Sequence, residues 1–219
     1  PLFEPGLDDL ISIGQTKGML EFSTDIPTNG TSADLVVISH DTPVDDNDLS
    51  DLSGIYDCLD TLAPILKEHT LIHVTAQVPV GTCHELRARA LKKFNKTFDF
   101  AYSPENLRLG KALELYKSPA LPVIGAQNKE TFEKIKAIYK PFDSEWFFCD
   151  LKTAEMLKHA LNSFLAVSIT FANELGNLCD EIGVDGHKVG QLLKLEPRVG
   201  NKAMLKPGLG FSGGTLARD

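Results

Sequence analysis

The strongest constraint on the fold is a dense run of β-branched residues, D-L-V-V-I-S, at positions 34–39. An apolar run without polar alternation is typical of a parallel strand that is buried on both faces. Further short apolar segments follow it, separated by stretches with the apolar spacing of helices. This alternation of strand and helix predicts an α/β fold with a layered parallel sheet. In such a sheet, ligands bind at the carboxyl ends of the strands.

The expected elements follow one another at short intervals up to Asp150. We expect strands at 34–39, 71–74, 98–102, 121–124 and 146–149, and helices at 48–67, 81–93 and 129–139. Right-handed crossovers between parallel strands place the carboxyl ends of those strands at one edge of the sheet. Residues 1–150 are therefore predicted to form one α/β domain.

The pattern changes in residues 151–219, where helical spacing dominates. Positions 153–182 are expected to form one long helix, with Thr153 as its N-cap and Gly183 just after its end. A helix of about 30 residues spans about 45 Å, which is more than one domain needs. Such a helix bridges domains or forms a dimer interface. A second helix is expected at 185–195, followed by a loop rich in glycine and proline.

Charge and cysteine content exclude several classes of function. The net charge of −8 argues against nucleic acid as a partner. The four cysteines have no Cys-x-x-Cys spacing and no neighbouring histidine cluster, so neither a disulfide framework nor a zinc site is indicated. Reduced thiols of this kind are typical of a cytoplasmic protein. No apolar run approaches the roughly 18 residues of a membrane span.

Seven short segments, taken in order, resemble the motifs of one enzyme family. They are E-P-G-L-D-D-L at 4–10, D-T-P at 41–43, Q-V-P-V-G-T at 77–82, S-P-E-N-L-R-L-G at 103–110, A-E-M-L-K-H-A-L-N-S-F-L at 154–165, L-E-P-R-V-G at 195–200 and G-F-S-G-G-T-L-A-R-D at 210–219. Each segment alone has little specificity, but seven in the right order are highly specific. The chain thus resembles the UDP-glucose/GDP-mannose dehydrogenase family.

The resemblance implies an NAD-dependent oxidoreductase that acts on the CH–OH group of a nucleotide sugar, in the supply of polysaccharide precursors. Residues 1–150 would form part of a Rossmann-like NAD-binding domain. Residues 151–219 would form the central helical and dimerisation domain, ending in the active-site loop. The family's glycine-rich dinucleotide fingerprint would precede this stretch, and its UDP-binding domain would follow. The implied partners are a nucleotide sugar and, through the 153–182 helix, a second copy of the chain.

The resemblance also implies the catalytic residues. Glu105 would handle water or a proton in the hydrolytic step. Lys158 would stabilise a developing oxyanion, and Asn162 would orient a water or the substrate hydroxyl. Asp219 would help to take the hydroxyl proton, and Thr215 occupies the position of the family's nucleophile. The implied residues on the cofactor side are Thr42, Pro43, Gln77 and Glu105, and those on the substrate side are Asn106, Leu107, Arg108, Lys158, Asn162, Phe211 and Gly213.

Taken without the resemblance, these residues have simpler interpretations. Lys158 and Asn162 lie four residues apart and share one face of a helix, as many solvated pairs do. Glu105 follows a strand and fits a surface carboxylate. Thr42 and Pro43 fit an ordinary turn. The glycines near the end of the sequence fit a flexible loop.

Five positions depart from the family pattern, and two of them, His40 and Ser212, replace small or glycine residues of their motifs. Thr215 replaces the cysteine, Gln77 replaces a threonine and Leu109 replaces a glutamate. A thiol forms useful amounts of thiolate near neutral pH, whereas a threonine hydroxyl does not. The full two-step oxidation, a one-step oxidation or epimerisation, and nucleotide-sugar binding without catalysis all remain open hypotheses.

Overall fold

The computed structural model describes residues 3–25, 32–47, 49–142 and 144–210. The chain divides into two compact units. The first unit comprises Pro1–Pro43 and Ser50–Leu157, and the second comprises Val44–Leu49 and Lys158–Asp219.

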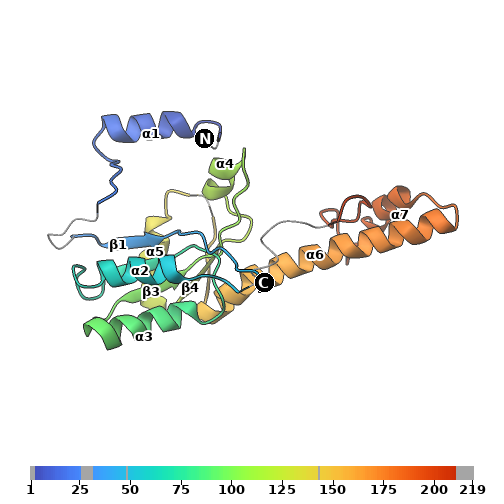
Figure 1. The fold of residues 1–219 in the computed structure, drawn as a ribbon. Helices are drawn as coiled ribbons and strands as arrows, with labels where there is room; N and C mark the ends of the chain where they lie inside the picture. The colour runs from blue at the N-terminus through green and yellow to red at the C-terminus, as the bar shows by residue number, and fades with distance from the viewer. Residues whose placement is uncertain (1–2, 26–31, 48, 143, 211–219) are drawn as a thin grey trace. The chain divides into compact units, whose positions relative to one another are not determined.

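The first unit is built on a five-stranded sheet with the strand order β1-β2-β3-β4-β5 (Figure 1). The strands are β1 (Leu35–Ile38), β2 (Leu71–Val74), β3 (Asp99–Tyr102), β4 (Val123–Ala126) and β5 (Phe147–Cys149). Three neighbouring pairs are parallel, and only β3 and β4 run antiparallel. The predicted α/β class with a parallel-dominated sheet is confirmed. The antiparallel pair departs from that prediction because the β3–β4 connection does not form a helical crossover across the sheet.

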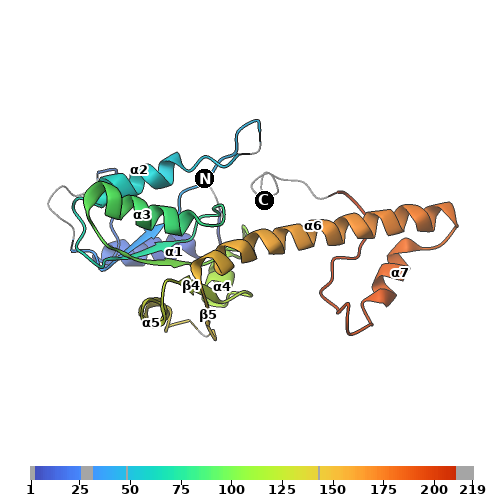
Figure 2. The same ribbon diagram turned by 90° about the horizontal axis from the view of Figure 1, so that it is seen from below.

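Helices cover both faces of this sheet. Helices α2 (Ser53–Leu62) and α3 (Thr82–Phe94) cover one face and α5 (Lys129–Ile138) covers the other, while α1 (Leu7–Thr16) and α4 (Ala112–Lys117) contribute no buried residue. Ile72 and Val74 of β2 belong to the core cluster that α2 and α3 cover, whereas Leu71 belongs to the cluster under α5 (Figure 2). Successive side chains of β2 thus lie on opposite faces of the sheet, as the two-residue repeat of a strand requires.

Prolines explain two of the differences from the expected boundaries. Helix α2 ends at Leu62 and not at residue 67, because Pro64 has no N–H to continue the helical hydrogen bonds. Strand β4 begins at Val123 and not at residue 121, because Pro122 has no N–H for the ladder. Helices α1 and α4 were not expected from apolar spacing.

The long helix α6 runs from Leu151 to Glu181. Its N-cap is Asp150, whose carboxylate accepts the N–H of Thr153 at 3.1 Å, so the prediction of Thr153 as the cap is wrong. Gly183 follows the helix with a φ of 71°, and the N–H of Val184 donates to the carbonyl of Cys179 at 2.8 Å. This is a Schellman ending, and the prediction for Gly183 is confirmed.

The second unit contains the part of α6 from Lys158 onward and helix α7 (Gly186–Leu193). Glycines allow close packing between its segments. A Cβ added at Gly176 would lie 2.7 Å from the Cβ of Pro207, and one added at Gly190 would lie 2.0 Å from the carbonyl oxygen of Leu205. Both contacts are far shorter than a real side chain tolerates.

Candidate functional site

One group of predicted site residues lies at the carboxyl edge of β1, β2 and β3 in the first unit. The chain reaches Thr42 and Pro43 after β1, Gln77 after β2 and Glu105 after β3. Because these strands are parallel, all three connections leave the same edge of the sheet. The buried Thr42 donates its hydroxyl to the carbonyl oxygen of Gln77 at 2.6 Å, which ties two of the turns together. Pro43 is exposed.

A buried carboxylate holds the next turn along this edge. Glu155 of α6 is fully buried and accepts the backbone N–H of Gly81 at 2.6 Å and that of Cys83 at 2.9 Å. These N–H groups belong to the N-terminus of α3, where an anion is stabilised by unpaired donors and by the helix dipole. Burial, and then the nearby charge of Glu155, raise the pKa of the Cys83 thiol. The thiol is therefore kept protonated and unreactive.

The role of Glu155 was missed in the sequence. Its position suggested only an acidic residue in the first turn of a helix. The signal that identifies it is its neighbour, the buried Ala154, which places this turn of α6 against the sheet. A charged residue on the buried side of a helix requires a partner, and here the partner is the end of another helix.

The loop after β3 carries four of the predicted residues. Glu105 is exposed, and its carboxylate accepts the N–H of Leu107. Asn106 is half-buried and donates its amide to the carbonyl of Pro104 at 3.4 Å, while Leu107 and Arg108 are exposed.

The far end of this loop is fixed by Glu4. The Glu4 carboxylate accepts the N–H of Gly110 at 2.7 Å and that of Leu113 at 3.2 Å. Glu4 is itself buried. A residue of the motif at 4–10 therefore holds the end of the motif at 103–110 in place.

A separate group of predicted site residues lies on α6 in the second unit. Lys158 is half-buried, and Asn162 follows one turn later with 7% of its surface exposed. Among the described residues, the Asn162 Nδ2 finds no hydrogen-bond partner. A buried amide without a partner is costly, so this donor is a natural point for a ligand oxygen. The simpler interpretation of Asn162 as a solvated residue does not fit its burial.

Four predicted residues lie outside the described residues: Phe211, Gly213, Thr215 and Asp219. Glu105 belongs to the first unit, whereas Lys158 and Asn162 belong to the second. The catalytic and binding roles of all these residues stay predictions.

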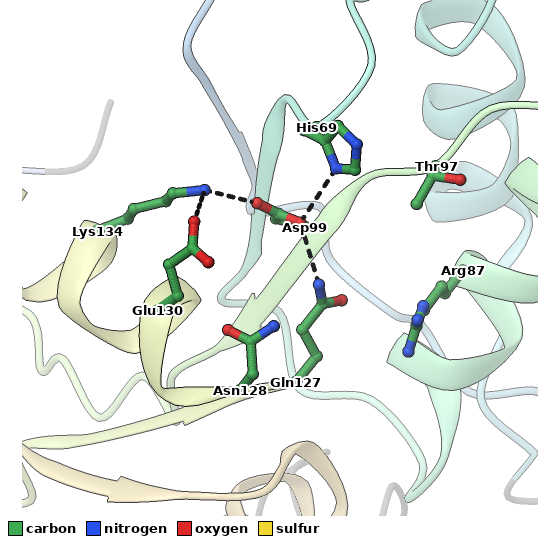
Figure 3. A pocket seen from close by; sticks show the side chains of 8 residues that line it. All are labelled: His69, Arg87, Thr97, Asp99, Gln127, Asn128, Glu130 and Lys134. Atoms are coloured by element: carbon green, nitrogen blue, oxygen red, sulfur yellow. Dashed lines mark hydrogen bonds and ion pairs between the residues drawn. The ribbon is translucent and has the colours of Figure 1, made fainter.

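A hollow of about 430 Å³ lies at the opposite edge of the sheet (Figure 3). At its centre Asp99, the first residue of β3, accepts the Gln127 amide at 3.0 Å and the Lys134 ammonium at 2.9 Å. Lys134 also pairs with Glu130 at 3.1 Å. These charges are satisfied by one another, and they connect β3 to α5. The hollow is thus not part of the carboxyl-edge site.

Comparison with known proteins identifies the family. The family model for the NAD-binding domain of UDP-glucose/GDP-mannose dehydrogenases matches residues 1–143, and the model for the central domain matches residues 152–219. The chain belongs to the UDP-glucose/GDP-mannose dehydrogenase family. The recognition made from the seven motifs is confirmed. The exact domain boundary at residue 150 stays a prediction.

Members of this family resemble the chain along its whole length. It is 33% identical over 221 residues to the UDP-glucose 6-dehydrogenase TuaD of Bacillus subtilis, covering 48% of that protein. It is 34% identical over 227 residues to a UDP-glucose 6-dehydrogenase of Rhizobium meliloti, covering 52% of it. The chain thus spans about half the length of the curated relatives it matches.

Solved structures of the UDP-glucose/GDP-mannose dehydrogenase family show the same fold. A UDP-glucose dehydrogenase of Pyrobaculum islandicum aligns with 98% of this chain and 51% of its own, with a TM-score of 0.89 and 31% identity. A GDP-mannose dehydrogenase of Pseudomonas aeruginosa aligns with 97% of this chain and 51% of its own, with a TM-score of 0.83 and 28% identity. The Rossmann-like character of the sheet is therefore confirmed. In the described part of this family member, no helix has both the length and the apolarity to cross a membrane.

Proposed function

We propose that the protein containing this chain is an NAD-dependent oxidoreductase that acts on the CH–OH group of a nucleotide sugar, with UDP-glucose as the first candidate. The observation that carries the proposal is the similarity of the whole chain, NAD-binding and central parts together, to UDP-glucose 6-dehydrogenases. The arrangement of the carboxyl edge supports it. The implied role is the supply of oxidised sugar precursors for polysaccharides.

The residues at the carboxyl edge fit NAD. The Thr42 turn and the Gln77 turn are joined by a hydrogen bond and follow parallel strands, which is where dinucleotides bind in such sheets. Glu155 already satisfies two N–H groups at the N-terminus of α3, so this helix end does not serve the cofactor's diphosphate. Thr42, Pro43 and Gln77, which the family resemblance places on the cofactor side, would contact the cofactor at this edge. Bound NAD supplies the hydride acceptor.

The residues of the chain have complementary tasks in this proposal. The carbon that bears the hydroxyl loses a hydride, the hydroxyl loses a proton to Asp219, and a carbonyl forms. The Lys158 ammonium stabilises the charge that develops on the oxygen during this step. The unpartnered amide of Asn162 donates to a substrate oxygen. Glu105, exposed on its loop, exchanges protons with water.

Thr215 favours a second version of this chemistry. A thiolate traps the aldehyde covalently, and the trapped adduct permits a second oxidation. A threonine hydroxyl is not ionised near neutral pH, so the intermediate is not held for a second hydride transfer. The reaction would then stop at the carbonyl product, or the hydride would return to give an epimer. Binding of a nucleotide sugar without chemistry is the remaining alternative.

The test is NAD reduction by the full-length protein with UDP-, GDP- and TDP-sugars, in wild type and in two variants. Lys158→Met removes the ammonium from the proposed site, and Lys152→Met removes an exposed ammonium from the same helix. Loss of one transition-state donor is expected to lower kcat by about 100-fold or more. The control variant should leave kcat within about twofold. Equal effects in both variants, or no NAD reduction with any sugar, contradict the proposal.

The same protein is proposed to form a homodimer through α6. Within the second unit, four apolar side chains at helical spacing are exposed along this helix, Phe164, Val167, Phe171 and Leu178, and the exposed Ile182 follows its end. An exposed apolar stripe of this length is typical of a protein interface. We also place the protein in the cytoplasm, where its four free thiols stay reduced.

The dimer is tested by light scattering after size-exclusion chromatography. Val167→Glu places a charge in the stripe and should halve the measured mass. Thr170→Glu places the same charge on an exposed position beside the stripe and should leave the mass unchanged. A wild type that is monomeric at micromolar concentration contradicts the inference.

A further inference from the structure

A histidine lies fully buried in the middle of the sheet. His73 is the third residue of β2 and has no exposed surface. Its Nε2 lies 2.9 Å from the Ser103 hydroxyl, and its Nδ1 lies 3.4 Å from the Tyr139 hydroxyl. The rings of His73 and Tyr139 meet edge to face with their centroids 5.8 Å apart. The imidazole thus links a hydroxyl at the edge of the sheet to one under α5.

The Tyr139 end of this chain of bonds is held by other aromatic side chains. The Tyr139 ring lies 4.7 Å from the Trp146 ring and 6.0 Å from the Phe142 ring, measured between centroids. Such clusters pack tightly and leave a ring little freedom. Tyr139 therefore gives His73 a fixed support on one side.

The protonation state of His73 suits a link between two hydroxyls. Burial lowers its pKa to about 4, so the ring is neutral near physiological pH. A neutral imidazole has one N–H donor and one acceptor nitrogen, and a hydroxyl can play either part. The ring can therefore bond to Ser103 and Tyr139 at the same time, whichever nitrogen carries the proton.

Ser103 connects this buried group to the candidate site. It is the first residue after β3, and its N–H donates to the carbonyl of Val74 at 3.1 Å. Pro104 follows it and is buried, and the proposed acid/base residue Glu105 comes next. The Ser103 hydroxyl bonds to the buried His73, so the first side chain of the loop that carries Glu105 has a partner inside the protein.

We propose that His73 is a positioning residue of this site: it holds Ser103, and through Ser103 it fixes the backbone that carries Glu105. The loop is then fastened at both ends, by His73 at its start and by Glu4 at Gly110. His73 does not touch the substrate and exchanges no proton with it. The effect on catalysis rests on the role of Glu105 in the proposed function, whereas the effect on the loop does not.

The test compares four variants of the full-length protein with wild type. His73→Leu removes both ring nitrogens and keeps the site apolar, and Ser103→Ala removes the partner with little change in volume. His73→Gln places an amide group near the position of the histidine Nε2, so that the bond to Ser103 can still form. Leu71→Ala is the matched control, because Leu71 is buried on the same strand and face but lies at the end of β2 that pairs with Asp99, away from Ser103.

Two readouts are needed. The first is hydrogen exchange of the backbone N–H groups of residues 103 and 105–110, which requires no enzymatic activity. Exchange should become about fivefold faster or more in His73→Leu and Ser103→Ala, and should be close to wild type in His73→Gln and Leu71→Ala. The second is NAD reduction. The first two variants should lose about five- to tenfold in kcat with KM for NAD unchanged, and their double variant should lose no more than either alone.

Each outcome decides a separate point. Unchanged exchange in both His73→Leu and Ser103→Ala overturns the proposal, whatever the activity. Faster exchange with unchanged kcat overturns its catalytic part, because the loop would move without effect on chemistry. If Leu71→Ala changes loop exchange and kcat as much as His73→Leu does, His73 acts only through packing. If wild type itself reduces no NAD, the proposed function fails, and the exchange data still decide whether His73 holds the loop.

Discussion

Substitution of Glu155 by glutamine gives the sharpest test of how the candidate site is held. The carboxylate is fully buried and accepts two backbone N–H groups, at 2.6 and 2.9 Å. Hydrogen bonds to a charged acceptor contribute about 1.5–3 kcal/mol each. A glutamine oxygen can accept one of these N–H groups, but its NH₂ then faces the other donor. Glu155→Gln is therefore expected to lower the free energy of unfolding by about 2–4 kcal/mol.

The assay is urea unfolding of the 219-residue chain, followed by the fluorescence of Trp146, the one tryptophan in the sequence and a residue of the first unit. Glu133→Gln is the matched control, because Glu133 is an exposed residue of α5 in the same unit. It should change the free energy of unfolding by less than about 0.5 kcal/mol. If the two variants unfold at the same urea concentration, the buried carboxylate does not hold the N-terminus of α3 and the reasoning is wrong.

Three further predictions concern other contacts. Burial lowers the pKa of His73 to about 4 in the folded chain, whereas in the unfolded chain it is about 6.5. As pH falls from about 6.5 to 4, the unfolded chain takes up a proton that the folded chain does not, so the free energy of unfolding of wild type should decrease. When pH is lowered from 7 to 5, the melting temperature of His73→Leu minus that of wild type should therefore increase. A difference that does not change with pH contradicts the burial of His73. Gly190→Ala should destabilise the second unit by about 2 kcal/mol or more because its Cβ would meet a carbonyl oxygen at 2.0 Å, whereas Gly208→Ala has open space and should unfold like wild type. Thr42→Val removes the bond to the Gln77 carbonyl and should raise KM for NAD several-fold with little change in kcat; an unchanged KM contradicts a cofactor role for this turn.

The fold was largely predictable because strand and helix have different periodicities. The second strand was expected at 71–74 and is found there, since four apolar or buried residues between turns admit few other structures. Helix α1 was missed although Leu7, Leu10 and Ile11 lie at helical spacing, and in the structure none of its residues is buried. The antiparallel pairing of β4 is a tertiary outcome that no local pattern encodes.

The candidate site was predictable only in part. Motif order located Thr42, Gln77 and Glu105, and the parallel strands place them at one edge of the sheet. Glu155 and His73 were missed, because each acts through a partner more than 25 residues away in sequence. Spacing along the chain reveals pairs on one helix or strand, but it does not reveal a carboxylate that caps a different helix.

The most direct measurement is the number of NADH molecules formed per molecule of UDP-glucose consumed by the full-length protein, with the product identified by mass. The account predicts one NADH and a carbonyl product, because Thr215 cannot hold the intermediate for a second oxidation. Two NADH with a uronic acid would contradict the inference from Thr215 while leaving the oxidoreductase in place. No NADH and no altered sugar, with UDP-glucose or with any other nucleotide sugar, would contradict the central claim.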